Sequence, residues 1–157
     1  MYKRQAWYCL NLWDHYQYTM DKDYLEKTAY PVMKSAVEFW MSELELDEDG
    51  LWVAPNSWSP EQSGRNNDEK GMHREKGSTY TQTLVWQLFR NTIEASETLG
   101  LDENERTEWK NRFDKIDPGL RVSDTVKKVL TDGTTSGVPV SYTHLIQVLR
   151  PKVPRIR

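Results

Sequence analysis

The sequence of 157 residues has a single cysteine, Cys9, and no long apolar run. One cysteine excludes an internal disulfide framework and a cysteine-ligated metal cluster, and its apolar helical position predicts a buried thiol. No stretch approaches the roughly 20 apolar residues that span a bilayer, so we expect no membrane partner.

The formal net charge is −3 and the basic residues are scattered, apart from a short C-terminal group. This charge pattern argues against a nucleic-acid partner.

Aromatic residues are abundant, with seven tryptophans and eight tyrosines. Large aromatic side chains serve both as core residues and as platforms for sugar rings. Composition therefore leaves two interpretations open, an aromatic-rich core and a carbohydrate-binding surface.

Apolar residues recur at helical spacing in four segments, which predicts an all-α chain with little strand. The predicted helices cover residues 6–20, 23–44, 79–99 and 103–114, and a short extended segment covers residues 51–53. Asp21 and Asp102 are candidate N-caps, and Gly100 is a candidate C-terminal cap. Pro31 either kinks the second helix or lies in its first turn.

Between the second and third predicted helices lies the segment Pro-Asn-Ser-Trp-Ser-Pro-Glu-Gln, residues 55–62. Its carboxylate, Glu61, is close in sequence to the indoles of Trp52 and Trp58. Partial desolvation by indoles raises a carboxyl pKa toward that of a proton donor. The segment is thus a candidate for the general acid of a glycosidase, and the alternative is a structural loop with a solvated glutamate.

Three blocks of sequence resemble glycoside hydrolase family 95, the inverting α-L-fucosidases. Order and spacing agree over about residues 6–121. The blocks are AWYCLNLWDHY at residues 6–16, AYPVMKSAVEF at residues 29–39, and SWSPEQ at residues 57–62 followed by TYTQTLVWQLF at residues 79–89.

The resemblance implies an all-α fold, namely part of an (α/α)6 toroid. Residues 6–121 would supply about four of its twelve helices, arranged as antiparallel hairpins with a long loop around Glu61. It also implies inverting hydrolysis of terminal α-L-fucosides, α-1,2-linked, with Glu61 as general acid and a fucosylated glycan as substrate. No cofactor is expected. The asparagine pair and aspartate that activate water in the family belong to segments outside this chain, and the family's location is secreted, periplasmic or cell-surface in bacteria.

Substrate-binding candidates are aromatic, imidazole and amide side chains near Glu61 or on the first predicted helix: Trp13, His15, Trp52, Asn56, Trp58, Gln62 and Tyr80. His15 has a second interpretation, a hydrogen-bonded core histidine. Two positions depart from the family pattern, since Asn11 stands where many relatives carry histidine and Thr81 stands where many carry aspartate.

The two ends of the chain contain peptides that resemble translated sequencing-library adapter. We therefore predict a metagenomic reading frame with a non-native leader over residues 1–5 and a divergent, artefactual or disordered tail over residues 122–157. Residues 6–121 are then the fragment of the catalytic domain, and the 157-residue chain is expected to be inactive without the rest of that domain. Two alternatives stay open: a non-catalytic carbohydrate-binding or protein-interaction helical module, and a helical-hairpin scaffold, which the lack of a 34-residue repeat disfavours.

Overall fold

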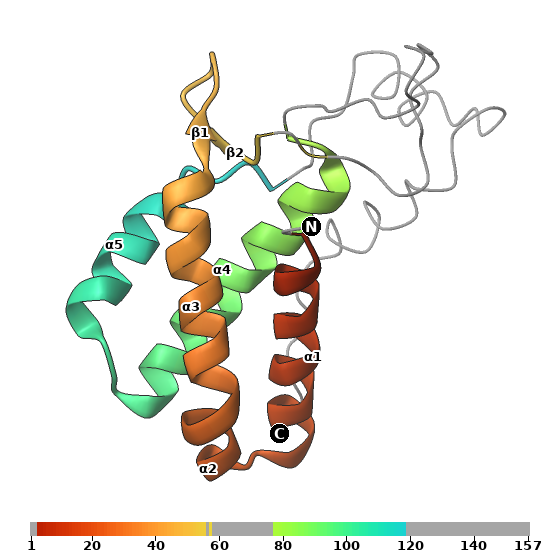
Figure 1. Ribbon diagram of the computed structural model, residues 1–157. Helices are drawn as coiled ribbons and strands as arrows, with labels where there is room; N and C mark the ends of the chain where they lie inside the picture. Colours follow the sequence, from red (N-terminus) through yellow and green to blue (C-terminus); the bar gives the residue numbers. More distant parts are fainter. Residues whose placement is uncertain (1–2, 56, 58–76, 119–157) are drawn as a thin grey trace, which may run out of the picture. The chain divides into compact units, whose positions relative to one another are not determined.

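The computed structural model describes residues 3–55, 57 and 77–118 (Figure 1). These residues form helices joined by short connections, with one two-residue strand pair, so the all-α prediction is confirmed. The elements in chain order are α1 (Lys3–Thr19), α2 (Lys22–Tyr24), the π-helical turn η1 (Leu25–Ala29), α3 (Tyr30–Glu43), β1 (Glu45–Leu46), β2 (Trp52–Val53), α4 (Thr79–Leu99) and α5 (Glu103–Phe113).

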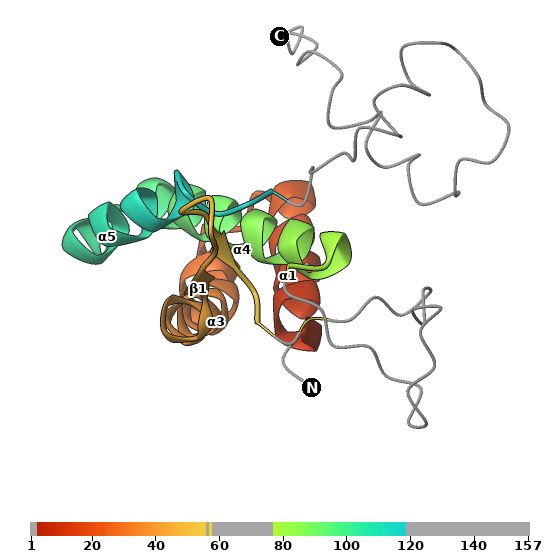
Figure 2. The same ribbon diagram turned by 90° about the horizontal axis from the view of Figure 1, so that it is seen from above.

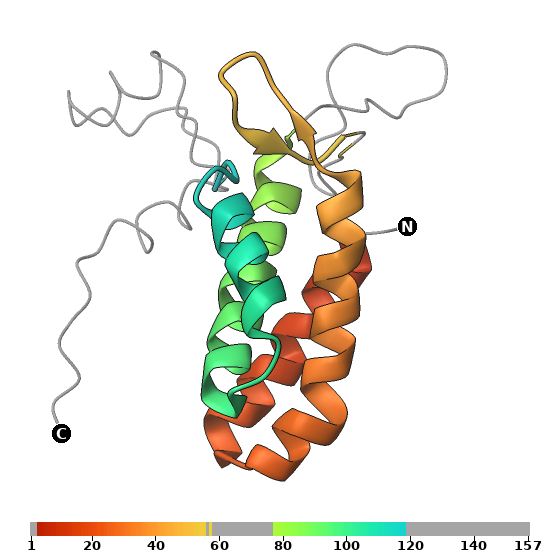
Figure 3. The same ribbon diagram turned by 90° about the vertical axis from the view of Figure 1, so that its left-hand side faces the viewer.

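The helices form two antiparallel hairpins, α1 with α3 and α4 with α5. Helix α4 is central, because it packs against α1, α3 and α5 (Figure 2). The antiparallel pair β1–β2 lies at the end of the bundle where α3 finishes and α4 begins (Figure 3). We call this the hairpin end, and we call the connection between α4 and α5 at the opposite end the α4–α5 corner.

The core is built from apolar side chains at helical spacing, as predicted. Removing such side chains from water contributes roughly 1.5–3 kcal/mol for each large one. The thiol of Cys9 is 1% exposed, and its burial raises its pKa to about 11. The main buried positions are Ala6, Cys9, Trp13 and Tyr16 in α1, Met33, Ala36, Val37 and Trp40 in α3, Leu84, Val85, Leu88 and Phe89 in α4, and Trp109 in α5.

The turn from α1 into α3 shows how the chain accommodates Pro31. Asp21 caps α2 as predicted, since its carboxylate accepts a hydrogen bond from the Tyr24 N–H at 3.0 Å. The π turn follows, and the Tyr30 N–H donates to the Leu25 carbonyl across it. Proline has no N–H to donate, and the first turn of a helix needs none. Pro31 lies in the first turn of α3. Of the two predicted arrangements, a kinked helix and a proline in the first turn, the second is therefore the correct one.

At the α4–α5 corner both predicted caps stand at the predicted positions, but the side chain of one of them does not cap its helix. Gly100 ends α4 in the left-handed conformation, with φ of 68°. Asp102 occupies the N-cap position of α5, but its side chain makes no capping hydrogen bond. Its carboxylate instead accepts a hydrogen bond from the Tyr30 hydroxyl at 2.7 Å and pairs with Lys34 Nζ at 2.8 Å. The aspartate therefore joins α3 to the corner.

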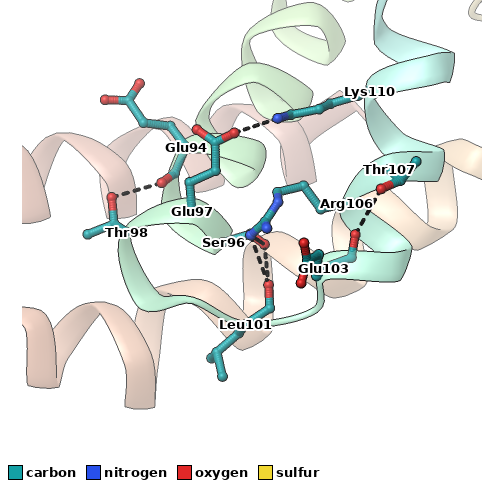
Figure 4. A network of polar contacts seen from close by, with 9 residues as sticks. All are labelled: Glu94, Ser96, Glu97, Thr98, Leu101, Glu103, Arg106, Thr107 and Lys110. Carbon is teal, nitrogen blue, oxygen red and sulfur yellow. Dashed lines mark hydrogen bonds and ion pairs between the residues drawn. The ribbon is translucent and has the colours of Figure 1, made fainter.

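A second set of polar contacts closes the same corner (Figure 4). Arg106 donates to the Ser96 hydroxyl oxygen at 3.1 Å and to the Leu101 carbonyl at 3.2 Å. Lys110 on α5 pairs with Glu97 on α4 at 2.5 Å. These contacts fix the angle at which α5 returns along α4.

Candidate functional site

The eight candidate site residues fall into three groups, of which the structure describes two. Four of its residues lie outside the described residues: Glu61, Asn56, Trp58 and Gln62. Two more, Trp52 in β2 and Tyr80 in the first turn of α4, lie at the hairpin end. The remaining two, Trp13 and His15, belong to the second half of α1. That helix runs away from the hairpin end at roughly 1.5 Å per residue, so, among the four described candidates, Trp13 and His15 lie apart from Trp52 and Tyr80.

Gln82 is the centre of the polar contacts at the hairpin end, and its side chain is 0% exposed. Its Oε1 accepts a hydrogen bond from the Ala54 N–H at 2.7 Å. Its Nε2 donates to the Trp52 carbonyl at 3.2 Å and to the Asp117 carbonyl at 2.8 Å. One neutral amide thus joins α4, the end of β2 and the segment after α5. Buried polar groups of this kind are costly unless they are satisfied.

The two ends of segment 58–76, which contains Glu61, are tied to each other. Ser57, which precedes the segment, accepts a hydrogen bond from the Ser78 N–H at 2.6 Å. Gly77, which follows it, donates its N–H to the Ala54 carbonyl at 3.0 Å. Both serines are buried. The chain therefore enters and leaves this segment at hydrogen-bonded positions beside Gln82.

Trp52 is held by its backbone and by a cation. Its N–H donates to the Lys115 carbonyl at 2.7 Å, and its carbonyl accepts from the Asp117 N–H at 3.1 Å. The guanidinium of Arg112 lies 3.6 Å from the centre of the Trp52 ring. That arrangement is a close cation–π contact. Because Arg112 covers one indole face, a sugar ring could stack only on the other.

Burial shapes the chemistry of Arg112 as well. Desolvation lowers the pKa of Arg112 below its ordinary value. Among the described residues, its Nη1 atom is buried with no hydrogen-bond partner. The indole face of Trp52 supplies part of the electrostatic stabilisation that the guanidinium loses on leaving water.

The α1 candidates have different surroundings. Trp13 is 3% exposed and packs against Tyr16, with ring centres 5.3 Å apart. His15 is exposed, and its ring lies 4.3 Å from that of Tyr24. The interpretation of His15 as a core histidine is therefore wrong for the described part of the chain. Substrate contact by Trp13 or His15 stays a prediction.

The two departures from the family pattern also have distinct environments. Thr81 is buried in the first turn of α4, and its Oγ1 accepts a hydrogen bond from the Ser78 hydroxyl at 3.1 Å. Asn11 is exposed on α1. Thr81 is therefore part of the contacts at the hairpin end, whereas Asn11 is not in the core of the described residues.

Sequence reasoning missed Gln82, Ser57, Ser78 and Arg112. A signal for Gln82 was present, because it lies three residues before Val85 and seven before Phe89, on the buried stripe of α4. A polar residue on an apolar helical face needs hydrogen-bond partners. The partners themselves come from other segments and carry no local signature.

The described residues contain neither a metal-binding cluster of side chains nor a helix suited to span a membrane. Among the residues that the structure describes, there is no group of three or more histidine, cysteine, aspartate or glutamate side chains that could hold a metal ion. No helix in the described ranges combines the length and the apolar composition of a membrane span.

Comparison with known families agrees with the helical arrangement. The glycosyl hydrolase family 95 catalytic domain matches residues 1–127. The chain belongs to this family. Its described helices are accordingly a part of the family 95 helical toroid.

Three relatives of known name share parts of this family 95 chain. Probable alpha-fucosidase A of Aspergillus niger is 32% identical over 124 residues, which is 74% of this chain and 15% of the relative. Alpha-L-fucosidase 2 of Arabidopsis thaliana is 34% identical over 95 residues, or 60% of this chain and 11% of the relative. Kojibiose hydrolase of Flavobacterium johnsoniae is 33% identical over 52 residues, which is 30% of this chain and 8% of the relative. The chain therefore spans only a small part of each relative.

Proposed function

We propose that this chain is the part of a glycoside hydrolase that contributes the general acid for hydrolysis of terminal α-L-fucosides. The observation that carries the proposal is the family 95 match over residues 1–127, together with two relatives named as fucosidases. By resemblance to the family, the linkage cleaved is α-1,2 and the reaction inverts the anomeric centre.

In this reaction Glu61 is the proton donor. Its carboxylic acid protonates the glycosidic oxygen as the bond from that oxygen to the anomeric carbon breaks. A water molecule attacks the same carbon from the opposite face and gives its proton to a base. In inverting enzymes the acid and base are roughly 6.5–9.5 Å apart. By the same resemblance the base side lies outside this chain, so residues 1–157 alone are expected to be inactive.

The test of this role is Glu61→Gln in the complete enzyme. General-acid catalysis contributes roughly 10²–10⁴-fold. We expect a loss of that size for a fucosyl disaccharide, and a much smaller loss for an aryl fucoside with a good leaving group, which needs less protonation. The matched control is Glu43→Gln at the exposed end of α3, which should leave both rates unchanged. Equal losses on both substrates in Glu61→Gln would contradict the assignment.

Substrate class and stereochemistry need separate measurements. Turnover of a fucosyl disaccharide should exceed that of kojibiose, and faster cleavage of kojibiose would contradict the fucoside proposal. Nuclear magnetic resonance during turnover should show the anomer opposite to that of the substrate first. Tight sugar binding by the complete protein, without turnover of either substrate, would instead favour the non-catalytic binding module.

A further inference from the structure

Helix α1 carries an aromatic-rich face that the other described elements leave exposed. On the side opposite its buried stripe, Trp7, Tyr8 and Tyr18 are 55%, 65% and 95% exposed. Asn11 and Asp14 are exposed between them. Steps of four, three and four residues place Trp7, Asn11, Asp14 and Tyr18 on one line along the helix, with Tyr8 beside it. We call these five residues the open face of α1.

The exposed side of α3 differs in chemistry from the open face of α1. It is mostly polar, because Ser35, Glu38 and Ser42 stand there at helical spacing. Val32 is its one exposed large apolar residue. A polar stripe is solvated by water and needs no partner, whereas several large aromatic side chains exposed on one helix face mark an interaction surface.

The packing of α4 indicates what kind of partner fits the open face. Helices α1 and α4 pack against each other and both run away from the hairpin end, so they are parallel neighbours (Figure 1). Each begins a hairpin, and α3 or α5 returns. Helix α4 has buried residues on a wide arc, because it packs against its return helix on one side and the α1–α3 hairpin on the other. The buried residues of α1 form one narrow stripe. Among the described residues, α1 therefore lacks the second parallel neighbour that α1 itself provides for α4.

We propose that the open face of α1 is the packing surface for another helix of the family 95 domain, one that begins a hairpin and runs parallel to α1. The chain spans 15% of the length of the Aspergillus niger relative. A toroid of hairpins closes on itself, so every hairpin has a neighbour on both sides. Trp7 and Tyr18 are about 16 Å apart along the helix axis, so the partner needs about three turns. The inference rests on family membership and not on the proposed reaction.

The first measurement is thiol labelling of the complete enzyme with a water-soluble maleimide, read for each peptide by mass spectrometry. Tyr8→Cys and Tyr18→Cys place thiols on the open face. Ser35→Cys places the matched control on the exposed side of α3, and the native Cys9 is the buried reference. Dividing each rate by the rate in concentrated urea corrects for the intrinsic reactivity of each thiol.

We expect the thiols at positions 8 and 18 to react at least about tenfold more slowly than the thiol at position 35, since a packed helix excludes the reagent. Equal rates at the three positions would overturn the inference. Protection that disappears on dilution would overturn it in favour of a second copy of the protein, and protection that needs a fucosyl oligosaccharide would overturn it in favour of a sugar-binding surface. If a variant fails to fold, hydroxyl-radical oxidation of the unchanged enzyme gives the same comparison, with Trp7 and Tyr18 expected to be as protected as the buried Trp109.

The direction of the partner helix is tested by photo-cross-linking from p-benzoylphenylalanine at position 7 or position 18 of the complete enzyme. Both positions should cross-link to one other helix of the domain, with the partner of position 18 about eleven residues later in sequence than the partner of position 7. The reverse order would contradict a parallel neighbour, and cross-links within residues 119–157 would show that this chain covers its own α1. None of these measurements uses turnover, so the inactive Glu61→Gln enzyme should give the same results, and a failure of the proposed function would leave the inference standing.

Discussion

At the α4–α5 corner the helices are joined by charged side chains that reach solvent, whereas the side-chain hydrogen bonds at the hairpin end come from neutral, buried residues, and the one charged group there, Arg112, stacks on Trp52. Asp102 and Lys34 are each about a quarter exposed, while Gln82 is fully buried. Exposed ion pairs contribute little and are screened by salt. A buried amide that satisfies backbone groups is costly to remove, because its partners are left without hydrogen bonds. The hairpin end should therefore be the stiffer of the two and the less sensitive to pH.

The contrast also separates two tasks. The corner fixes how α5 returns along α4, and nothing in the family resemblance connects it with catalysis. The hairpin end fixes the ends of the segment that contains Glu61. Substitutions that weaken each end in turn should show this difference in chemistry in the free energy of unfolding.

The largest effect is expected for Gln82→Met. The Ala54 N–H and the Asp117 carbonyl lose their hydrogen bonds to Gln82, while the Trp52 carbonyl keeps the one that it accepts from the Asp117 N–H. Each unsatisfied group costs about 1–3 kcal/mol, so the free energy of unfolding should fall by about 2–4 kcal/mol after partial relaxation. Urea unfolding of the 157-residue chain measures it. The control is Gln87→Met at a half-buried position on the same helix, with an expected change within about 0.5 kcal/mol. A loss below about 1 kcal/mol for Gln82→Met would remove the contrast between the ends.

A smaller effect is expected for Asp102→Asn, about 1 kcal/mol at neutral pH after allowance for solvent screening. Lys34, and then Tyr30, lower the pKa of Asp102 below its ordinary value of 3.8. A carboxyl with a lowered folded-state pKa stabilises above its ordinary pKa, and that contribution is lost as the pH falls through the folded value. The difference between Asp102→Asn and the parent should therefore shrink below about pH 4. Unfolding at about pH 7 and pH 3 measures it, and a difference that is constant across that range would contradict the ion-pair account.

The smallest effect is expected for Lys110→Met. Its partner Glu97 and Lys110 itself are both about half exposed. Such pairs contribute at most about 0.5 kcal/mol, and the contribution should vanish in high salt. Thermal unfolding at low and high salt measures it. A loss larger than that of Asp102→Asn would show that exposure is a poor guide to strength at this corner.

The sequence alone predicted the helices and caps that depend on residues close together in the chain. The stripe around Met33 and Val37 gave α3, because burial of one helical face leaves a periodic pattern. Gly100 was identified because a left-handed residue ends many helices and glycine adopts that conformation at low cost. The Asp21 cap was likewise predicted correctly from its position before a helix.

The features decided by distant partners were not predicted. Asp102 stands at the predicted N-cap position of α5, but its side chain makes no capping hydrogen bond, because Tyr30, 72 residues away in sequence, and Lys34 take its carboxylate. The role of Gln82 was missed because two of its partners lie 28 and 35 residues away. The interpretation of His15 as a core histidine was wrong because the exposure of His15 depends on which face of α1 the other helices cover.

The most direct test of the account is a crystal structure of the complete enzyme carrying Glu61→Gln with an uncleaved fucosyl disaccharide. We expect the sugar to lie at the hairpin end, with the side chain of residue 61 about 2.6–3.2 Å from the glycosidic oxygen. We also expect the Gln82 hydrogen bonds to Ala54 and Asp117 to be intact. A sugar bound at the α4–α5 corner, or a residue 61 side chain too far from the glycosidic oxygen for a hydrogen bond, would contradict it.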